Sequence, residues 1–467
     1  KTARELESDP TKTANEDENA SKRKVDNIIR RRRHLILIAQ NQTGLNNIFR
    51  MISTSFQGDN FYRYPRVDYD LLDKHSEGVI AASACLGGVY AGNYWDNRDD
   101  GEEAVLRAMR ETTKRMKDIF GKRWYGELQW NDIPEQHELN KYVLQMRDEF
   151  DIDVISTADS HYPTPTAWKD RELYKRLGFL NRPNKPEWMT SELPIDVDEI
   201  GYELYPKNGD QMWESYKKYS EECGYEYDDQ VIYDSLTTTH WIAHELIEDF
   251  MPDDTVRLPG FVVPENQTAT QALARACITG LTDLGLHEND EYVKRLKHEL
   301  HVIDDRGFSK YFLTMKAIAD KANENMLSGP GRGSAAGSSR FLRADATDYP
   351  DIDYDVSDAF GLKEILAEEW GETTVVPISN FNTLQLRSLI KDISKFYEVP
   401  FTEVNPVTSK MMQEATPRAK QAHGVKAGVY IPTFEEIMEY SESLQSFLNK
   451  YPHIKTHVEA LYGQVRS

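Results

Sequence analysis

Apolar and polar positions alternate in a regular way along the first third of the chain. Short apolar runs occur at residues 34–39, 78–82, 124–129 and 154–157, and stretches with helical spacing occur at about residues 101–120 and 134–150. Strands that alternate with helices are typical of an α/β layer or barrel. The pattern therefore predicts an α/β domain in this part of the chain.

Beyond residue 162 the pattern becomes mainly helical. Residues 162–250 and 270–325 read as helices, and the proline-bearing connector between them, residues 251–264, predicts a domain boundary. A further strand is expected at residues 371–378. Because 467 residues exceed what one hydrophobic core usually supports, two or three domains are expected.

Residues 384–397 form the clearest amphipathic pattern. One stripe at helical spacing is apolar and comprises Leu386, Leu389, Ile390, Ile393, Phe396 and Tyr397. Arg387, Lys391 and Lys395 form a second stripe, four residues apart. Such a stripe is either a solvated helix face or a track for DNA phosphates, and the sequence supports both interpretations equally.

A glycine-rich loop at residues 329–338 is a candidate phosphate site. Glycines lack a Cβ, so their backbone N–H groups can turn toward an anion, and Arg332 and Ser334 add donors. A P-loop is excluded because no Lys-Ser or Lys-Thr follows the glycines. Residues 331–336 satisfy the dinucleotide fingerprint with Asp351 as its acid, but the lead-in is polar rather than an apolar strand. The dinucleotide fold is the weaker account, and a plain tight turn is the other alternative.

Three aspartates follow this loop at alternate positions. As a strand, the segment places Asp351, Asp353 and Asp355 on one face and Ile352, Tyr354 and Val356 on the other. A solvated edge strand protected by charge is one interpretation. Carboxylates beyond a Gly-Ser loop also suit phosphoryl transfer that depends on divalent metal.

Composition limits the classes of partner. A net charge of −22 argues against nonspecific coating of nucleic acid, although a local basic track remains compatible with it. Three widely spaced cysteines fit a reducing compartment better than a disulfide framework. No apolar run approaches the length of a membrane span, and the start lacks a secretory apolar region, so a cytoplasmic protein without a membrane partner is expected.

Several motifs together resemble the family of bacterial replicative DNA polymerase III alpha subunits. Residues 307–313, 329–338, 350–353 and 374–404 are similar to its palm and its passage to the thumb, and residues 34–41, 84–88, 125–129 and 158–162 to its polymerase-and-histidinol-phosphatase (PHP) domain. The resemblance implies an α/β and α+β multidomain chain. Its parts would be an incomplete PHP-type α/β barrel at residues 1–258 with a helical extension from about residue 162, a nucleotidyltransferase-like palm at 259–381, a helical thumb at 382–452, and the start of a return to the palm at 453–467.

The resemblance also implies template-directed DNA synthesis, in which a deoxynucleotide is transferred to a primer 3′-hydroxyl. Asp351 and Asp353 would be catalytic and hold two Mg²⁺ ions, and Gly331, Arg332, Gly333 and Ser334 would bind the nucleotide phosphates. Arg387, Lys391 and Lys395 would follow the duplex phosphates. The implied partners are primer-template DNA and deoxynucleoside triphosphates, with a sliding clamp and other replisome subunits bound through regions absent from this chain.

The family pattern is interrupted in three places. No His-x-His pair precedes His34, the connector between Ser338 and Asp351 is short, and no third catalytic aspartate or fingers follow. The chain alone is therefore expected to be inactive or very weak as a polymerase. Asp355 is interpreted as an acid that supports the metal ligands or as a strand-end charge.

The sequence also contains candidate ligands for a second metal site. His34, Cys85, Asp159 and His161 match ligand positions of the family's PHP site, and their side chains can bind Zn²⁺ or Mn²⁺. With half of the ligand set missing, a functional site is not expected. A PHP-type phosphoesterase or 3′–5′ exonuclease at this site, and a DNA-binding replisome scaffold without catalysis, are the alternative functions.

Overall fold

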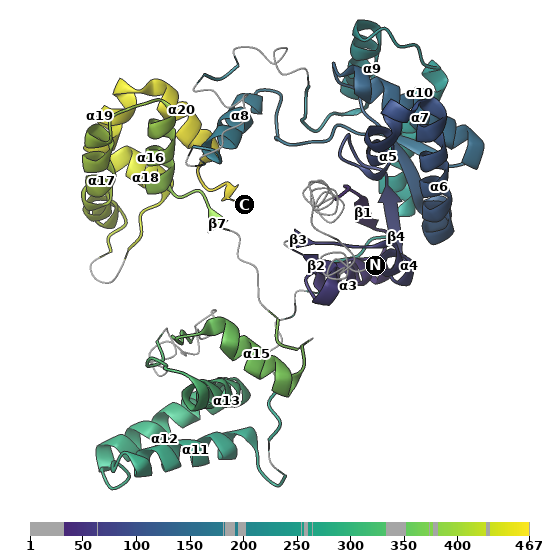
Figure 1. Cartoon of the computed structure of the whole chain (residues 1–467). Coiled ribbons are helices and arrows are strands. Elements are labelled where there is room, and N and C mark those ends of the chain that lie inside the picture. Colours follow the sequence, from purple (N-terminus) through teal and green to yellow (C-terminus); the bar gives the residue numbers. More distant parts are fainter. Residues whose placement is uncertain are drawn as a thin grey trace, which may run out of the picture. The chain divides into compact units, whose positions relative to one another are not determined.

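The computed structural model describes residues 32–62, 64–180, 182, 192–194, 202–253, 255, 260–263, 265–332, 352–372, 374–376, 382–425 and 430–466. The chain divides into two compact units, Lys1–Pro252 with Phe381–Ser467, and Asp253–Asn380. Figure 1 shows the chain coloured from purple at the amino terminus to yellow at the carboxyl terminus. The first unit contains a sheet domain and a helical bundle, each with its own hydrophobic core.

Among the described residues, the sheet domain contains four strands in the order β1-β4-β5-β6. These are β1 (Ile36–Ala39), β4 (Val79–Ala82), β5 (Trp124–Leu128) and β6 (Asp153–Ser156). Strand β1 is antiparallel to β4, whereas β4, β5 and β6 run parallel. Val79 and Ala81 pack into one apolar cluster and Ile80 and Ala82 into another, because successive side chains of a strand point to opposite faces. The sheet is therefore buried on both faces, as parallel strands usually are.

Helices supply the apolar partners of this sheet. They are α3 (Gln42–Ser55), α4 (Tyr69–Lys74), α5 (Val89–Asn97), α6 (Glu102–Phe120), α7 (Pro134–Phe150), α9 (Gly209–Glu222) and α10 (Asp229–Trp241). A π-helical turn, Ile242–Leu246, follows α10 and packs Ile242 on the smaller cluster. The remaining elements are 3-10 turns at Gly58–Asn60, Arg98–Asp100 and Gly121–Arg123, and the paired strands β2 (Phe61–Tyr62) and β3 (Tyr64–Pro65).

The helical bundle combines two distant parts of the sequence. Its helices are α16 (Leu386–Phe396), α17 (Phe401–Ala422), α18 (Phe434–Tyr440), α19 (Glu442–Lys450) and α20 (Pro452–Leu461), joined by α8 (Trp168–Leu177). Leu173 of α8 is buried in the same core as Leu389 of α16. Asp170 of α8 accepts a hydrogen bond of 2.7 Å from His457 of α20, and Figure 1 shows the two helices side by side. Strand β7 (Asn382–Thr383) pairs with β8 (Val465–Arg466), so residues 453–466 pack onto this bundle.

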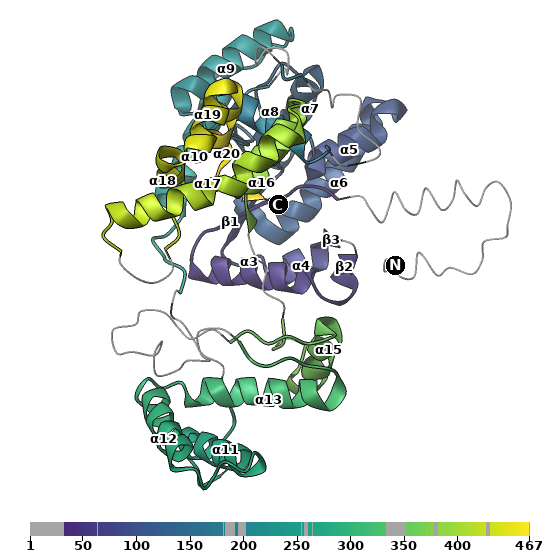
Figure 2. The same ribbon diagram turned by 90° about the vertical axis from the view of Figure 1, so that its left-hand side faces the viewer.

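The described part of the second unit contains four helices and a pair of extended segments. The helices are α11 (Ala269–Asp283), α12 (Asp290–Asp305), α13 (Ser309–Asn325) and α15 (Ala359–Trp370). Helix α13 packs against α11 through Leu273 and Leu313, and against α15 through Ala322 and Leu366. Figure 2 shows α13 between α15 on one side and α11 with α12 on the other.

Most predicted elements are confirmed. The four apolar runs are the four strands of the sheet, and the two helical stretches between them are α6 and α7. The apolar stripe of residues 384–397 is also confirmed, since Leu389, Ile390 and Ile393 are each 0% exposed on α16. In the described part of the chain the sheet is open and four-stranded, so the barrel, the palm and the thumb stay predictions.

The strand predicted at residues 371–378 is wrong for the residues that the structure describes there. Residues 371, 372 and 374–376 form a turn. Gly371 ends α15 with a φ of 95°, and the N–H groups of Thr374 and Val375 both donate to its carbonyl. The helix end therefore captures the backbone groups that a sheet ladder would need.

Candidate nucleotide and metal site

The glycine loop and the aspartate segment are neighbours in the second unit. The backbone N–H of Arg332 donates to the carbonyl of Asp353 at 2.7 Å, and the N–H of Asp353 donates back to Arg332 at 2.9 Å. Gly329 donates to the carbonyl of Asp355 at 2.9 Å, and Ser357 donates to that of Leu327 at 2.9 Å. These bonds form an antiparallel seam, so the start of the loop and the second half of the aspartate row lie side by side.

The predicted alternation of the aspartate segment is confirmed where the structure describes it. Asp353 and Asp355 are exposed, whereas Ile352, Tyr354 and Val356 are half-buried. Val356 packs toward α15, and Ile352 and Tyr354 line an apolar cavity of about 360 Å³ over α11 and α13. The helices thus support the apolar face of the strand and leave its carboxylate face open.

Arg332 crosses the seam to the aspartate row. Its guanidinium donates to Asp355 at 2.6 Å, and both side chains are exposed, at 60% and 64%. A Cβ on Gly329 would lie 3.3 Å from the Cβ of Asp355, so glycine allows this close approach. A Cβ on Gly331 would meet no described residue within 4 Å.

Not all of the predicted site can be placed. Gly333, Ser334 and Asp351 lie outside the described residues, so their roles stay predictions. Asp353 makes no ion pair with any residue that the structure describes, and its carboxylate faces solvent. Mg²⁺ prefers hard oxygen ligands and is usually held by one or two carboxylates together with substrate phosphates. The donor chemistry of Asp353 fits that requirement.

The predicted PHP-type ligands lie at one edge of the sheet domain. Cys85 and Asp159 follow the carboxyl ends of the parallel strands β4 and β6, and His34 precedes β1, which is antiparallel to β4. The carboxyl edge of parallel strands is a common ligand site. His34 Nδ1 lies 3.4 Å from the Cys85 sulfur, and a Cβ on Gly87 would come within 2.9 Å of that ring nitrogen. Gly87 thus leaves room for the His34 ring.

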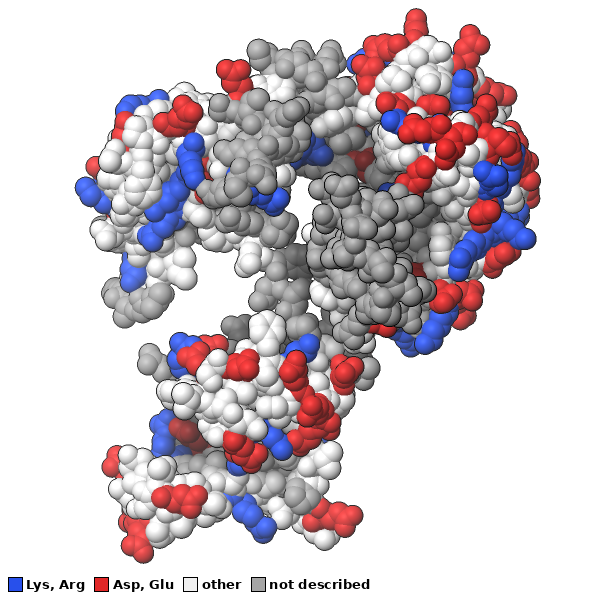
Figure 3. Space-filling view, viewed as in Figure 1, with Lys and Arg blue, Asp and Glu red and all other residues white. Residues whose placement is uncertain are grey.

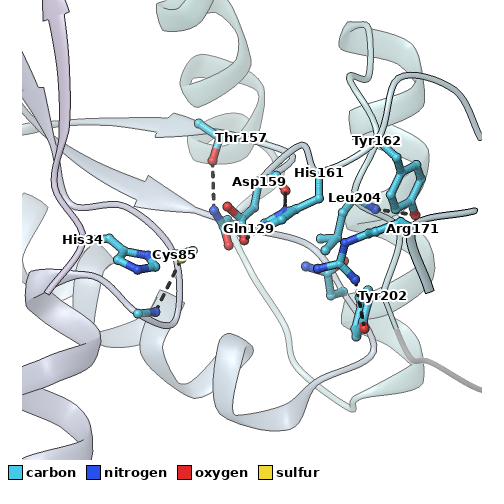
Figure 4. Close-up of polar contacts among 12 residues, drawn as sticks. His34, Cys85, Gln129, Thr157, Asp159, His161, Tyr162, Arg171, Tyr202 and Leu204 are labelled. Carbon is cyan, nitrogen blue, oxygen red and sulfur yellow. Dashed lines mark hydrogen bonds and ion pairs between the residues drawn. The ribbon is translucent and has the colours of Figure 1, made fainter. Parts of the chain in front are cut away.

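The four predicted ligands do not form one group. Figure 4 shows His34 beside Cys85, with Asp159 and His161 gathered separately near Gln129 and Thr157. His161 Nδ1 is hydrogen-bonded to the carbonyl of Asp159 and lies 4.0 Å from its carboxylate. Among the residues that the structure describes, no three His, Cys, Asp or Glu side chains are placed to hold one metal ion. A Zn²⁺ or Mn²⁺ ion at this edge stays a prediction.

Glu127 also lies at this edge, and sequence reasoning assigns it no role. Its carboxylate is 4% exposed and accepts hydrogen bonds from the N–H of Ala84 at 2.8 Å and the hydroxyl of Thr157 at 2.7 Å. It therefore ties the segment after β4 to the segment after β6. The available sequence signal was a charged residue inside an otherwise uncharged strand, Trp124–Leu128.

Burial raises the pKa of Glu127, and the negative charge of Asp159 raises it further. The hydrogen bonds from Thr157 and Ala84 lower it, but burial outweighs them. Burial also raises the pKa of the Cys85 thiol, and the charges of Asp159 and Glu127 raise it further. Ala84 and Asp159 both have positive φ, at 61° and 47°, which is uncommon outside glycine. The edge therefore combines desolvated acidic groups with strained backbone, a combination found at functional sites.

The predicted DNA track lies on α16 of the helical bundle. Arg387 and Lys395 are exposed, and Lys391 is half-buried with its ammonium 3.3 Å from the side-chain oxygen of Asn405 and over the ring of Phe401. Figure 3 shows Lys and Arg side chains on the bundle, whereas Asp and Glu are dense over α9 of the sheet domain. Arg387 and Lys395 are exposed enough for contact with a phosphate backbone, and Lys391 is partly engaged within the bundle. None of the helices in the described part of the chain is long and apolar enough to span a membrane.

Comparison with known proteins finds two families in this chain. Residues 6–131 match the PHP domain, and residues 271–339 and 338–462 match the bacterial DNA polymerase III alpha NTPase domain. The second match contains the whole seam between the glycine loop and the aspartates. The first contains His34, Cys85 and Glu127 but ends before Asp159.

Curated relatives carry one name. The DNA polymerase III subunit alpha of Aquifex aeolicus is 28% identical over 91% of this chain, that of Borreliella burgdorferi is 28% identical over 83%, and that of Thermus aquaticus is 25% identical over 89%. The chain spans only 36%, 33% and 38% of the length of these relatives. The two domain matches, in their order, and relatives that cover most of the chain show that it belongs to the family of bacterial DNA polymerase III alpha subunits.

Proposed function

We propose that the chain contributes the metal and triphosphate site of template-directed DNA synthesis. The observation that carries this proposal is the seam in which Gly329–Arg332 pairs with Asp353–Asp355. It brings a guanidinium and two carboxylates to one solvent-facing surface. Phosphate needs donors and cations, whereas divalent metal needs carboxylates, and a metal-complexed triphosphate needs both at once.

The residues take the following roles in this proposal. Asp353 would hold Mg²⁺ together with Asp351, which lies outside the described residues. Arg332 and the other residues of 331–334 would bind the β- and γ-phosphates. Bound Mg²⁺ would neutralise phosphate charge and favour ionisation of the primer 3′-hydroxyl. The primer oxygen then bonds to the α-phosphorus, and pyrophosphate leaves. Residues 259–381 would be a nucleotidyltransferase-like palm, and residues 382–452 a thumb whose Arg387 and Lys395 follow the duplex backbone.

The substrates and partners follow from the same proposal. They are primer-template DNA and deoxynucleoside triphosphates, with a sliding clamp and other replisome subunits bound through regions outside this chain. The PHP-type edge carries no second proposed activity, because its ligands do not converge among the described residues. We expect the chain alone to extend a primer weakly or not at all, so binding is the deciding measurement.

The test measures binding of a fluorescent deoxyadenosine triphosphate analogue to the full chain. Binding is detected as fluorescence anisotropy, once with Mg²⁺ present and once with a chelator. We expect Mg²⁺-dependent binding that Asp353→Asn weakens at least about ten-fold, since one carboxylate ligand is lost. Glu324→Gln removes one exposed acidic charge of α13 and should leave binding unchanged. Binding that ignores both Mg²⁺ and Asp353→Asn would contradict the proposal, and DNA binding with no triphosphate binding would favour the scaffold.

A further inference from the structure

Arg332 lies opposite Asp353 in the seam, but its side chain does not bind the Asp353 carboxylate. The backbone groups of these two residues exchange both hydrogen bonds, so they form a directly facing pair. In such a ladder the diagonal neighbour two residues along the partner strand lies on the same face. That neighbour is Asp355, and the guanidinium binds it at 2.6 Å.

This choice of partner matters because a guanidinium and a divalent cation compete for the same carboxylate oxygens. An arginine within reach of a metal-binding carboxylate forms an ion pair that the metal must displace. Asp353 has no ion pair with any described residue, although Arg332 is its facing neighbour. Because Arg332 binds Asp355, the Asp353 carboxylate is left without an arginine partner among the described residues.

We propose that Asp355 is a positioning residue that holds Arg332 away from Asp353 and so keeps the Asp353 carboxylate free for a divalent cation. This inference rests on the proposed function, because it assumes that Asp353 is a metal ligand. It differs from a role of Asp355 as a ligand. In the ligand role Asp355 itself contacts the ion, whereas in the positioning role it acts only through Arg332.

The exposure of the pair fits this role. Both side chains are more than half exposed, and exposed ion pairs are weak. The ion pair therefore orients Arg332 but is weak enough to break. A phosphate, which carries more negative charge, can replace Asp355 as the partner of Arg332. The apolar partners of the strand, Ile352 and Tyr354, lie on the opposite face, so replacing Asp355 should leave the packing intact.

The experiment is a mutant cycle on the full chain, with Mn²⁺ affinity measured by electron paramagnetic resonance. Asp353→Asn first establishes whether Mn²⁺ binds at this site. We expect Asp355→Ala to weaken Mn²⁺ binding by about five-fold, the size of an exposed ion pair. Combining Arg332→Ala with Asp355→Ala should restore the Mn²⁺ affinity to within about two-fold of that of the single variant Arg332→Ala. Asp355→Asn, whose amide oxygen still accepts from Arg332, should fall between the wild type and Asp355→Ala.

The outcomes separate the two levels of the argument. If Asp353→Asn leaves Mn²⁺ binding unchanged, the proposed function fails. If binding depends on Asp353 but the double variant remains as weak as Asp355→Ala, Asp355 is a ligand and the positioning role is overturned. Glu299→Ala breaks another arginine–carboxylate contact of 2.6 Å in the same unit, with a half-buried carboxylate, and should leave Mn²⁺ affinity unchanged.

Discussion

Replacing the buried carboxylate of Glu127 should change the stability of the sheet domain in two distinguishable ways. In Glu127→Ala the N–H of Ala84 and the hydroxyl of Thr157 lose their acceptor inside the protein. An unpaired buried donor costs about 1–3 kcal/mol, so for two donors we expect a loss of about 2–6 kcal/mol in the free energy of unfolding. In Glu127→Gln the amide oxygen still accepts the hydrogen bond from Ala84. The amide NH₂ can only donate, so the Thr157 hydroxyl must rotate and accept instead. The loss in the free energy of unfolding at pH 7 should be about 1 kcal/mol or less.

The pH dependence gives the sharper result. The folded protein raises the pKa of Glu127 above its ordinary value, chiefly through burial. The folded state therefore binds this proton more tightly than the unfolded state. The resulting stability is fully present below the ordinary pKa of Glu and is lost as pH rises through the raised folded pKa. Glutamine does not titrate, so the stability of Glu127→Gln relative to the wild type should rise between pH 4 and pH 7.

Urea unfolding followed by tryptophan fluorescence measures this, because Trp124 and Trp130 are buried in the same core. Glu149→Gln is a control of opposite sign, since hydrogen bonds from Arg110 lower the pKa of Glu149. Stability from a lowered pKa is present at high pH and lost as pH falls. The free energy of unfolding of Glu149→Gln relative to the wild type should therefore decrease from pH 4 to pH 7. A Glu127→Gln curve parallel to the wild type, or an alanine variant as stable as the glutamine variant, would refute the reasoning.

Two further predictions concern the helical bundle. Leu389→Ala, at a side chain that is 0% exposed on α16, should cost about 2–5 kcal/mol in urea unfolding, whereas Arg387→Ala on the exposed side should stay within about 0.5 kcal/mol; equal losses would contradict the observed burial. The double variant Arg387→Ala with Lys395→Ala should weaken duplex DNA binding and lower the salt slope of the binding constant by about 1.8, since each phosphate contact contributes about 0.9. An unchanged salt slope would assign this stripe to a solvated face.

Local patterns were sufficient to predict the elements of the fold. Strand β4 is a short apolar run that is buried on both faces, and α16 is a regular stripe of leucine and isoleucine. The alternation of Asp353, Tyr354 and Asp355 likewise follows from the period of a strand. In each case the signal lies within a few residues, so no knowledge of distant contacts was needed.

Contacts between distant residues were not predictable. The sequence pattern places helix α8 in the PHP-like part of the chain, yet Leu173 packs in the bundle core and Asp170 binds His457 from the other end of the chain. The tie that Glu127 makes between two strand ends needed the sheet order before it had meaning. The sequence predicts a phosphate contact for Arg332. Its bond to Asp355 depends on the register of the seam, which the sequence does not specify.

The central claim is that metal and triphosphate meet at the seam of Gly329–Arg332 and Asp353–Asp355. Fe²⁺ in place of Mg²⁺, with ascorbate and peroxide, produces hydroxyl radicals that cut the backbone beside the bound ion. Cleavage of the full chain is measured with a deoxynucleoside triphosphate present, in the wild type and in Asp353→Asn. Paired cuts near Gly331 and Asp353 that disappear in Asp353→Asn are the expected result, whereas cuts confined to the neighbourhood of Cys85 and Asp159 would contradict the claim and move the metal to the sheet domain.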